Sequence, residues 1–507
     1  MRSLDDARSA TRAVVLSAAS VLVFATFAAM PGSPFQPAAL PTGYTPGGPF
    51  VWLARSLRLD RLSGSLAIAV GVGITLFAIA SFLLLLWEAW RGNVSLRAVL
   101  ALVVAYHVVI LFLPVLFSRD VYSYAFYGRI VGIYRGNPYV QTPLTFSKDP
   151  LWGLLGPKWV DTPAVYGPLF TSIAGIFARW FGSPIGEVDA FRLLAIVASL
   201  ATVFVTAWTS RELWPSRAPF AVVAFGANPV ILFHSVASAH NDLLVALSVI
   251  VGLSFLMRGK ELPAVASLTL GTLIKASGAL PLLLLIVYCV ARRPPEERRR
   301  AWFSHAGLAA GLALLFAMPY LQLHDPTFGM LELAHHEGWL AASLFFQRLF
   351  EDIGLGPLGV VVRIGFAIAL IVGVWLLAIE VWRRDRELSP RGNGAAWGWA
   401  LLMLMLLGPV LVPWYVVWAM PLVWLLPRAP RSALIGVGVF LAVAQWATES
   451  VNYPAAFSAD LLIGRWVISP VIIGLIAWML ADLRRRLREG RPLECEEEDV
   501  AAAAGGG

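Results

Sequence analysis

Long apolar windows, separated by short polar segments, repeat along almost the whole chain. Each window matches the roughly 20 apolar residues that a helix needs to cross a bilayer. The pattern therefore predicts an all-α polytopic membrane protein, which we expect to form a single transmembrane domain over residues 1–500. The predicted spans lie at 13–30, 65–88, 98–117, 190–208, 219–237, 241–257, 302–320, 358–382, 396–411, 414–427, 432–447 and 466–483.

The stretch 262–291 is also apolar, but Lys275 interrupts it. One long helix would carry this lysine in mid-bilayer. It would also place the basic run 292–300 on the opposite face of the bilayer from Arg258 and Lys260, against the positive-inside rule. Two short helices that hinge at Lys275 to Gly278 avoid both problems. The topology then has about fourteen spans. It places both termini in the cytoplasm and predicts two long outer loops, at about 118–189 and 321–357.

Composition supports this topology. With 58% hydrophobic residues, 14% charged residues and a mean hydropathy of +0.73, the chain cannot hide its apolar surface in a water-soluble core. Most of the 39 Lys and Arg residues fall in the predicted inner segments, as the positive-inside rule requires. The net charge of +8 therefore follows from topology, and we expect no nucleic acid partner.

The ends of the chain leave two questions open. The first apolar stretch follows Arg2, Arg8 and Arg12, so it resembles a signal peptide as well as a retained span. The outer segment 31–64, which is rich in arginine, matches no known functional element. Residues 501–507 are low-complexity, and we interpret them as a frayed end or an expression tail.

A first polar cluster follows the span 98–117. Ser118 is a predicted N-cap of a helix that carries Asp120, Tyr124 and Tyr127 on one face. The helix dipole keeps a carboxylate in the first turn ionised, so Asp120 can serve as a base. The alternative is an interfacial helix with its tyrosines in the aromatic belt and Asp120 paired with Arg119 or Arg129.

Further polar and aromatic residues are predicted at the same outer face. Asp161 and Tyr166 lie in a loop rich in turn formers, whereas Trp414 and Tyr415 lie at a turn between spans. Aromatic rings beside carboxylates suit a sugar, which offers C–H faces and hydroxyls. The adjacent trio His240, Asn241 and Asp242 opens the span 241–257, and three polar side chains there exceed what a helix cap requires.

Cations near these residues are candidate phosphate ligands. Lys275 lies at the predicted hinge, where snorkelling to headgroups is an equal explanation, and His335 and His336 lie in the outer loop 321–357. Adjacent histidines point about 100° apart on a helix, and no zinc-binding spacing occurs. We therefore predict no metal and no other cofactor. Nucleotide-binding motifs are also absent from the sequence, so a sugar donor would come from the membrane.

Five motifs occur in an order that is similar to a known family. They are Ser118 to Tyr124, Gly136 to Tyr139, Asp161 to Pro168, His240 to Asp242 and Pro413 to Tyr415. Over about residues 100–480 the chain resembles the polyprenol-phosphomannose-dependent alpha-1,6-mannopyranosyltransferases of bacterial envelope lipoglycan synthesis, which have the GT-C fold.

The resemblance implies an inverting transfer of mannose from polyprenyl phosphate to a hydroxyl of a glycan or glycolipid. The reaction would take place at the extracytoplasmic face of the bacterial plasma membrane, with Asp120 as general base. We assign the donor phosphate to Lys275, His335, His336 and Arg119. We assign sugar or acceptor binding to Asp161, Tyr166, His240, Asn241, Asp242, Trp414, Tyr415 and Tyr124.

Three alternatives stay open. The same fold could use polyprenyl-phosphate glucose or arabinofuranose as its donor. A secondary transporter or lipid flippase would also have broken helices and buried charges. Against a transporter, the two halves of the sequence show no repeat, and apart from Lys275 the predicted spans carry almost no charge in their interior. A scaffold without turnover would leave the outer polar clusters unexplained.

Overall fold

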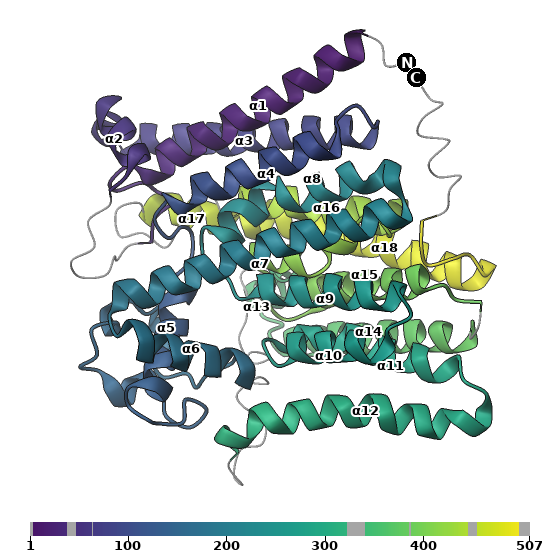
Figure 1. Ribbon diagram of the computed structural model, residues 1–507. Helices are drawn as coiled ribbons and strands as arrows, with labels where there is room; N and C mark the ends of the chain where they lie inside the picture. The colour runs from purple at the N-terminus through teal and green to yellow at the C-terminus, as the bar shows by residue number, and fades with distance from the viewer. Residues whose placement is uncertain are drawn as a thin grey trace. The chain divides into compact units, whose positions relative to one another are not determined.

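A computed structural model describes residues 4–37, 47–62, 64–321, 340–384, 387–444 and 454–495. All regular secondary structure in these ranges is helical (Figure 1). Contacts divide the chain into two compact units. Unit 1 contains Met1–Ala164, Thr171–Leu243 and Gly438–Ile463, and unit 2 contains Val165–Phe170, Leu244–Val437 and Gly464–Gly507. The single domain expected from the sequence stays a prediction.

Six segments within the described residues are long and apolar enough to cross a bilayer. They are α1 (Leu4–Ala29), α3 (Gly64–Trp90), α7 (Pro184–Leu213), Pro295–Tyr320 with α12 (Pro295–Ala317), α14 (Pro357–Arg383) and Leu461–Glu489 with α18 (Ser469–Glu489). Shorter apolar helices are α4 (Leu96–Leu111), α9 (Asp242–Met257) and Ala276–Ala291. The chain is thus a multi-pass membrane protein, and the all-α polytopic class expected of a GT-C protein is confirmed.

Two predicted spans are irregular. At 219–237, α8 (Ala218–Gly226) is followed by a π-helix, Val230–Val236, with a bend of 45°. The break lies at Pro229, which cannot donate a backbone hydrogen bond. The straight helix predicted at 414–427 is wrong, because the chain there forms 3₁₀ turns at Pro413–Trp418 and Met420–Leu422, each starting beside a proline. The count of about fourteen spans stays a prediction.

In unit 1, α1, α3, α4, α7 and α8 pack side by side (Figure 1). An aromatic stack fixes their ends: the ring of Phe24 lies 4.8 Å from that of Phe35 and 3.5 Å from that of Phe233. Phe117, which lies between α4 and α5 and has a positive φ of 55°, stacks at 4.0 Å on His234. The turn toward the first polar cluster therefore rests on a packed aromatic core.

Helix α5 (Asp120–Gly132) packs very closely against α6 (Pro168–Phe181) within unit 1. A Cβ at Gly128 would lie 2.4 Å from the carbonyl oxygen of Ala174, and a Cβ at Gly132 would lie 2.4 Å from that of Gly175. Glycines four residues apart on one face are a known device for close helix packing in membranes. Gly128 and Gly132 thus set the position of α5, which carries Asp120.

The short helix α2 (Pro49–Ser56) belongs to the outer segment that the sequence left without a role. Its Val51 and Ala54 are buried, whereas Trp52 and Arg55 are exposed. Helix α17 (Pro454–Ile463) also belongs to unit 1. Helix α16 (Arg428–Ala444) begins in unit 2 and ends in unit 1.

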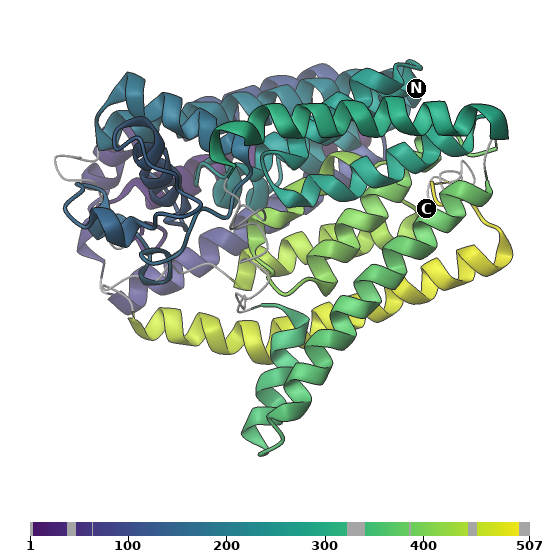
Figure 2. The same cartoon turned by 90° about the horizontal axis from the view of Figure 1, so that it is seen from below.

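Unit 2 contains the predicted hinge. Helix α10 (Glu261–Thr272) and helix α11 (Ala279–Ala291) are separated by a break in which Lys275 is extended, with φ −153° and ψ 138°. The prediction of two short helices is therefore confirmed. Helix α15 (Pro390–Leu407) packs on both α11 and α14. Helix α13 (Ala342–Asp352) turns back on the start of α14, as the green pair at the bottom of Figure 2 shows.

Candidate functional site

The first part of the site is the start of α5. The helix begins at Asp120, whose backbone N–H donates to the hydroxyl of Ser118 at 3.1 Å. The predicted N-cap is off by one residue, because Arg119 occupies that position and makes no side-chain capping hydrogen bond. The Ser118 hydroxyl instead accepts from the N–H of the first helical residue. Ser238 donates its hydroxyl to the carbonyl oxygen of Leu116. That hydrogen bond joins the segment before α5 to the segment before His240.

Asp120 and the trio His240 to Asp242 meet in unit 1. The Oδ2 atom of Asp120 lies 3.6 Å from Nδ1 of His240, and the Tyr124 hydroxyl lies 3.2 Å from the same nitrogen. Tyr124 also donates to Oδ1 of Asn241 at 3.3 Å, and Oδ2 of Asp242 lies 4.0 Å from His240 Nδ1. Five residues assigned from the sequence therefore form one cluster, which we call the Asp120 cluster.

Burial separates the two carboxylates of the Asp120 cluster. The side chains of His240 and Asp242 have 0% exposure, whereas that of Asp120 has 19%. Asp120 is thus the carboxylate that a substrate can reach. Asp242, the first residue of α9, contacts the imidazole from within the protein. The arrangement suits an accessible base beside a histidine held by buried partners.

Tyr127 links α5 to the loop that follows it. Its hydroxyl donates to the carbonyl oxygen of Thr162 at 2.9 Å. Burial, together with the negative charge of Asp120, raises the pKa of Tyr127 far above its ordinary value. The side chain therefore stays a neutral phenol that positions the loop, in line with a structural role for this tyrosine.

A buried ion-pair network at the other end of α5 was not predicted. Arg129 binds Asp149 and Glu187, each at 2.7 Å, and Tyr134 donates its hydroxyl to Asp149 at 2.7 Å. Burial lowers the pKa of Arg129, but the hydrogen bond to Asp149 and the charge of Glu187 outweigh it and raise this pKa overall. The partners are too far apart in sequence for any local pattern to join them.

Two further assigned residues lie in the same unit but outside the contacts just described. Arg119 donates to the carbonyl oxygen of Leu155 at 3.5 Å. Asp161 is exposed and accepts a hydrogen bond from Thr142 at 3.2 Å. Arg119 thus contacts the loop between α5 and α6, and Asp161 is part of that loop. Their roles toward donor phosphate and sugar stay predictions.

In unit 2 the hinge lysine lies against aromatic rings. Lys275 is only 7% exposed, and its Nζ lies 4.6 Å from the ring centroid of Tyr415 and 5.5 Å from that of Trp418. Tyr415 and Trp418 stack on each other at 4.0 Å. The burial and the cation–π contacts favour a fixed cation over one that snorkels to the headgroups. Trp414, also from this segment, is 9% exposed.

The segment with Tyr166 is attached to the same hinge by its backbone. Gly167 donates to the carbonyl oxygen of Ile274 at 2.9 Å, and Leu169 donates to that of Leu273 at 3.1 Å. A Cβ at position 167 would lie 2.1 Å from the Leu273 oxygen, so only glycine fits there. Tyr166 is therefore held beside the break that contains Lys275.

The structure thus groups the assigned residues in two places. Asp120, Tyr124, His240, Asn241 and Asp242 form a cluster in unit 1, whereas Lys275, Tyr166, Trp414 and Tyr415 belong to unit 2. The expectation that all of them share one pocket stays a prediction. His335 and His336 lie outside the described residues. Trp418 is an addition that sequence reasoning missed, although it lies three residues after Tyr415, one 3₁₀ turn away.

Comparison with known proteins agrees with the motifs. The model of a family described as "Alpha-(1->6)-mannopyranosyltransferase, N-terminal domain" matches residues 21–292, more than half of the chain. The chain is 25% identical to alpha-(1->6)-mannopyranosyltransferase A of Mycobacterium tuberculosis over 352 residues, which are 64% of this chain and 65% of that relative. It is 25% identical to alpha-(1->6)-mannopyranosyltransferase B of Corynebacterium glutamicum over 417 residues, 74% of this chain and 66% of that relative.

The chain therefore spans 65% to 66% of the length of these relatives, slightly less than two thirds. No solved structure matches the chain. The match of the family model to more than half of the sequence, in a region that includes Asp120, His240 and Lys275, decides the assignment. The chain belongs to the alpha-(1->6)-mannopyranosyltransferase family.

Proposed function

We propose that the protein is an inverting mannosyltransferase that uses polyprenyl phosphate mannose as its donor. The acceptor is a hydroxyl of a glycan or glycolipid at the extracytoplasmic face of the bacterial plasma membrane, with both termini in the cytoplasm. The observation that carries the proposal is the Asp120 cluster: an accessible carboxylate lies 3.6 Å from a buried histidine within a membrane protein of this family.

The Asp120 carboxylate acts as the general base. An acceptor hydroxyl has too high a pKa to attack unaided at neutral pH, so a carboxylate within hydrogen-bond reach takes its proton as the new C–O bond forms. Asp120 lies in the first turn of α5, where the helix dipole favours its ionised form. His240 contacts this carboxylate and is itself held by Tyr124 and Asp242, so we assign it a positioning role.

The donor phosphate is assigned to the hinge lysine. As the bond between the sugar and the phosphate breaks, a phosphate monoester leaves and its negative charge grows. Lys275 supplies a fixed cation, and the aromatic face of Tyr415 beneath its ammonium keeps it in place. Trp414 and Tyr166 supply aromatic surface for the sugar ring. A good leaving group and a resident cation make a divalent metal dispensable for this step.

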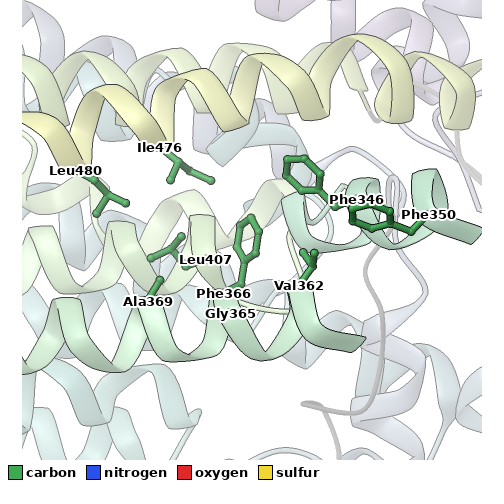
Figure 3. A pocket seen from close by; sticks show the side chains of 9 residues that line it. All are labelled: Phe346, Phe350, Val362, Gly365, Phe366, Ala369, Leu407, Ile476 and Leu480. Atoms are coloured by element: carbon green, nitrogen blue, oxygen red, sulfur yellow. The ribbon is translucent and has the colours of Figure 1, made fainter. Parts of the chain in front are cut away.

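The prenyl chain of the donor needs an apolar groove, and unit 2 contains one. A pocket of about 510 Å³ lies between α13, α14, α15 and α18, and Figure 3 shows only hydrocarbon side chains around it. We assign the lipid tail to this pocket because a hydrocarbon chain gains roughly 0.8 kcal/mol per buried methylene. The lining residues are Phe346, Phe350, Val362, Gly365, Phe366, Ala369, Leu407, Ile476 and Leu480.

The test is a donor comparison with the purified full-length protein in nanodiscs. Synthetic polyprenyl phosphate mannose, glucose and arabinofuranose are each supplied with a mannan acceptor, and products are analysed by mass spectrometry. We expect a covalent mannosyl product with inverted anomeric configuration. Consumption of glucose or arabinose instead would replace the sugar but keep the enzyme class. Movement of intact donor lipid between leaflets without a covalent product would refute a glycosyltransferase.

A further inference from the structure

Three metal-ligating side chains from three helices of unit 2 meet far from the hinge. Glu261 begins α10, Cys289 lies near the end of α11, and His305 belongs to α12. Their ligand atoms all lie within 4.8 Å of one another. Cys289 is fully buried and His305 is 4% exposed, whereas the side chain of Glu261 is 20% exposed. The group is therefore accessible to solvent at the carboxylate of Glu261.

The histidine is oriented as a metal ligand. Its Nδ1 lies 2.7 Å from the carbonyl oxygen of Ala301, and its Nε2 lies 3.2 Å from Oε2 of Glu261. The Ser304 hydroxyl also lies 3.1 Å from Nδ1, so neighbours on its own helix hold that nitrogen and Nε2 is the one that faces Glu261. A hydrogen bond from the second ring nitrogen to a backbone carbonyl is the usual support of a metal-bound histidine.

The surrounding charge suits a divalent ion. Arg293 donates to Oε2 of Glu261 at 2.6 Å and is 39% exposed, so its guanidinium can turn toward solvent when an ion takes its place. Glu261 supplies a carboxylate, and a cysteine binds a metal as a thiolate, so the ligands Glu261 and Cys289 together offset the charge of a divalent ion.

We propose that Glu261, Cys289 and His305 bind Zn²⁺, with water as the fourth ligand. Thiolate, imidazole and carboxylate together are zinc ligands, whereas Mg²⁺ and Ca²⁺ prefer oxygen alone. Tetrahedral coordination needs ligand atoms about 3.3 to 3.8 Å apart. Nε2 of His305 and Oε2 of Glu261 are already 3.2 Å apart, so the thiol of Cys289 is the group that moves closer when the ion binds. The proposal does not rest on the proposed function.

The metal would clamp the helices rather than take part in transfer. Glu261 and the hinge are at opposite ends of α10, whose 12 residues span about 18 Å. Cys289 is likewise at the end of α11 remote from Lys275. A zinc ion here joins α12 to the ends of α10 and α11 that are remote from Lys275, so it fixes these two helices at the ends opposite the hinge.

Cobalt is the optical probe for this site. The full-length protein in detergent is stripped with EDTA and titrated with Co²⁺, and thiolate-to-cobalt absorption is recorded in the near ultraviolet. We expect saturation at one equivalent and displacement by Zn²⁺. Cys289→Ser should abolish the absorption. Cys495→Ser is the matched control, because Cys495 is the other buried cysteine and accepts a hydrogen bond from Arg431 instead.

The wild-type protein alone can overturn the proposal. Absence of the thiolate-to-cobalt absorption, or of bound zinc by elemental analysis, refutes the site without reference to any variant. Equal absorption in Cys289→Ser would also refute it. As a second readout, Zn²⁺ should raise the melting temperature of the stripped wild type but not that of His305→Gln, since an ion that binds only the folded state stabilises it. Mannosyl transfer per folded molecule should stay unchanged after stripping.

Discussion

Asp120 is the solvent-accessible one of the two carboxylates in the Asp120 cluster. Its neighbour Asp242 is fully buried and contacts the same histidine nitrogen at 4.0 Å, so the two acids have separate tasks. The i, i+4 relation between Asp120 and Tyr124 was readable from the sequence, and so was their position just after the apolar stretch 98–117. Their meeting with His240 required the fold.

Replacing Asp120 by Asn should remove the base while keeping the shape of the side chain. We expect the variant to insert and fold, with turnover lowered roughly 10²- to 10⁴-fold. Initial rates with polyprenyl phosphate mannose measure this. Asp189→Asn is the control, because Asp189 is an exposed carboxylate that pairs with Arg192 on its own helix. Near wild-type turnover of Asp120→Asn would transfer the role of base to Asp161 or Asp242.

Sequence reasoning failed at residues whose partners are distant and chemically ordinary. Arg129 was considered only as a neighbour of Asp120, yet it binds Asp149 and Glu187, which are 20 and 58 positions away. The zinc ligands proposed here come from three helices, so no short spacing motif marks them. Local patterns report neighbours on one helix, and they carry no information on which helix ends meet in space.

At the scale of elements, periodicity predicted most helices but not their breaks. The two halves at Lys275 were recognised because a charge in mid-bilayer is costly. The bend after α8 and the 3₁₀ turns at 413–422 were missed, because apolar composition concealed the effect of Pro229, Pro413 and Pro421. The 3₁₀ turns carry Trp414 and Tyr415, so this omission fell on residues assigned to the candidate site.

The pocket beside α14 allows a test of the lipid assignment. A Cβ at Gly365 meets nothing within 4 Å, so Gly365→Leu should fill the pocket without a clash. Excluding about two methylenes of the prenyl chain costs roughly 1.5 kcal/mol, or about tenfold in donor KM. The effect should be larger for long-chain than for short-chain polyprenyl donors, as steady-state kinetics would measure.

The same substitution elsewhere provides the comparison for Gly365→Leu. Gly311 in α12 also has nothing within 4 Å of a Cβ, and it is not among the pocket residues. Gly311→Leu should leave donor KM unchanged. If both variants behave alike, or if donor chain length makes no difference in Gly365→Leu, the prenyl chain lies elsewhere.

At the scale of the whole molecule, the number and orientation of spans are predictions from hydropathy and from the positions of Lys and Arg. Both natural cysteines are buried, so single introduced cysteines can report the orientation. We expect Val140→Cys to react with a membrane-impermeant maleimide on intact cells, and Arg488→Cys to react only after lysis. Both positions are exposed. The opposite labelling pattern would place the Asp120 cluster on the cytoplasmic side and refute the proposed topology.

The attachment of the Tyr166 segment to the hinge also has a practical consequence. Because Gly167 and Leu169 bind Leu273 and Ile274 through backbone atoms alone, the joint does not depend on which side chain stands at position 166. Substitutions of Tyr166 can therefore test its proposed contact with the sugar while these backbone hydrogen bonds stay intact. Position 167 offers no such freedom, since the Cβ of any larger residue would clash with the backbone of Leu273.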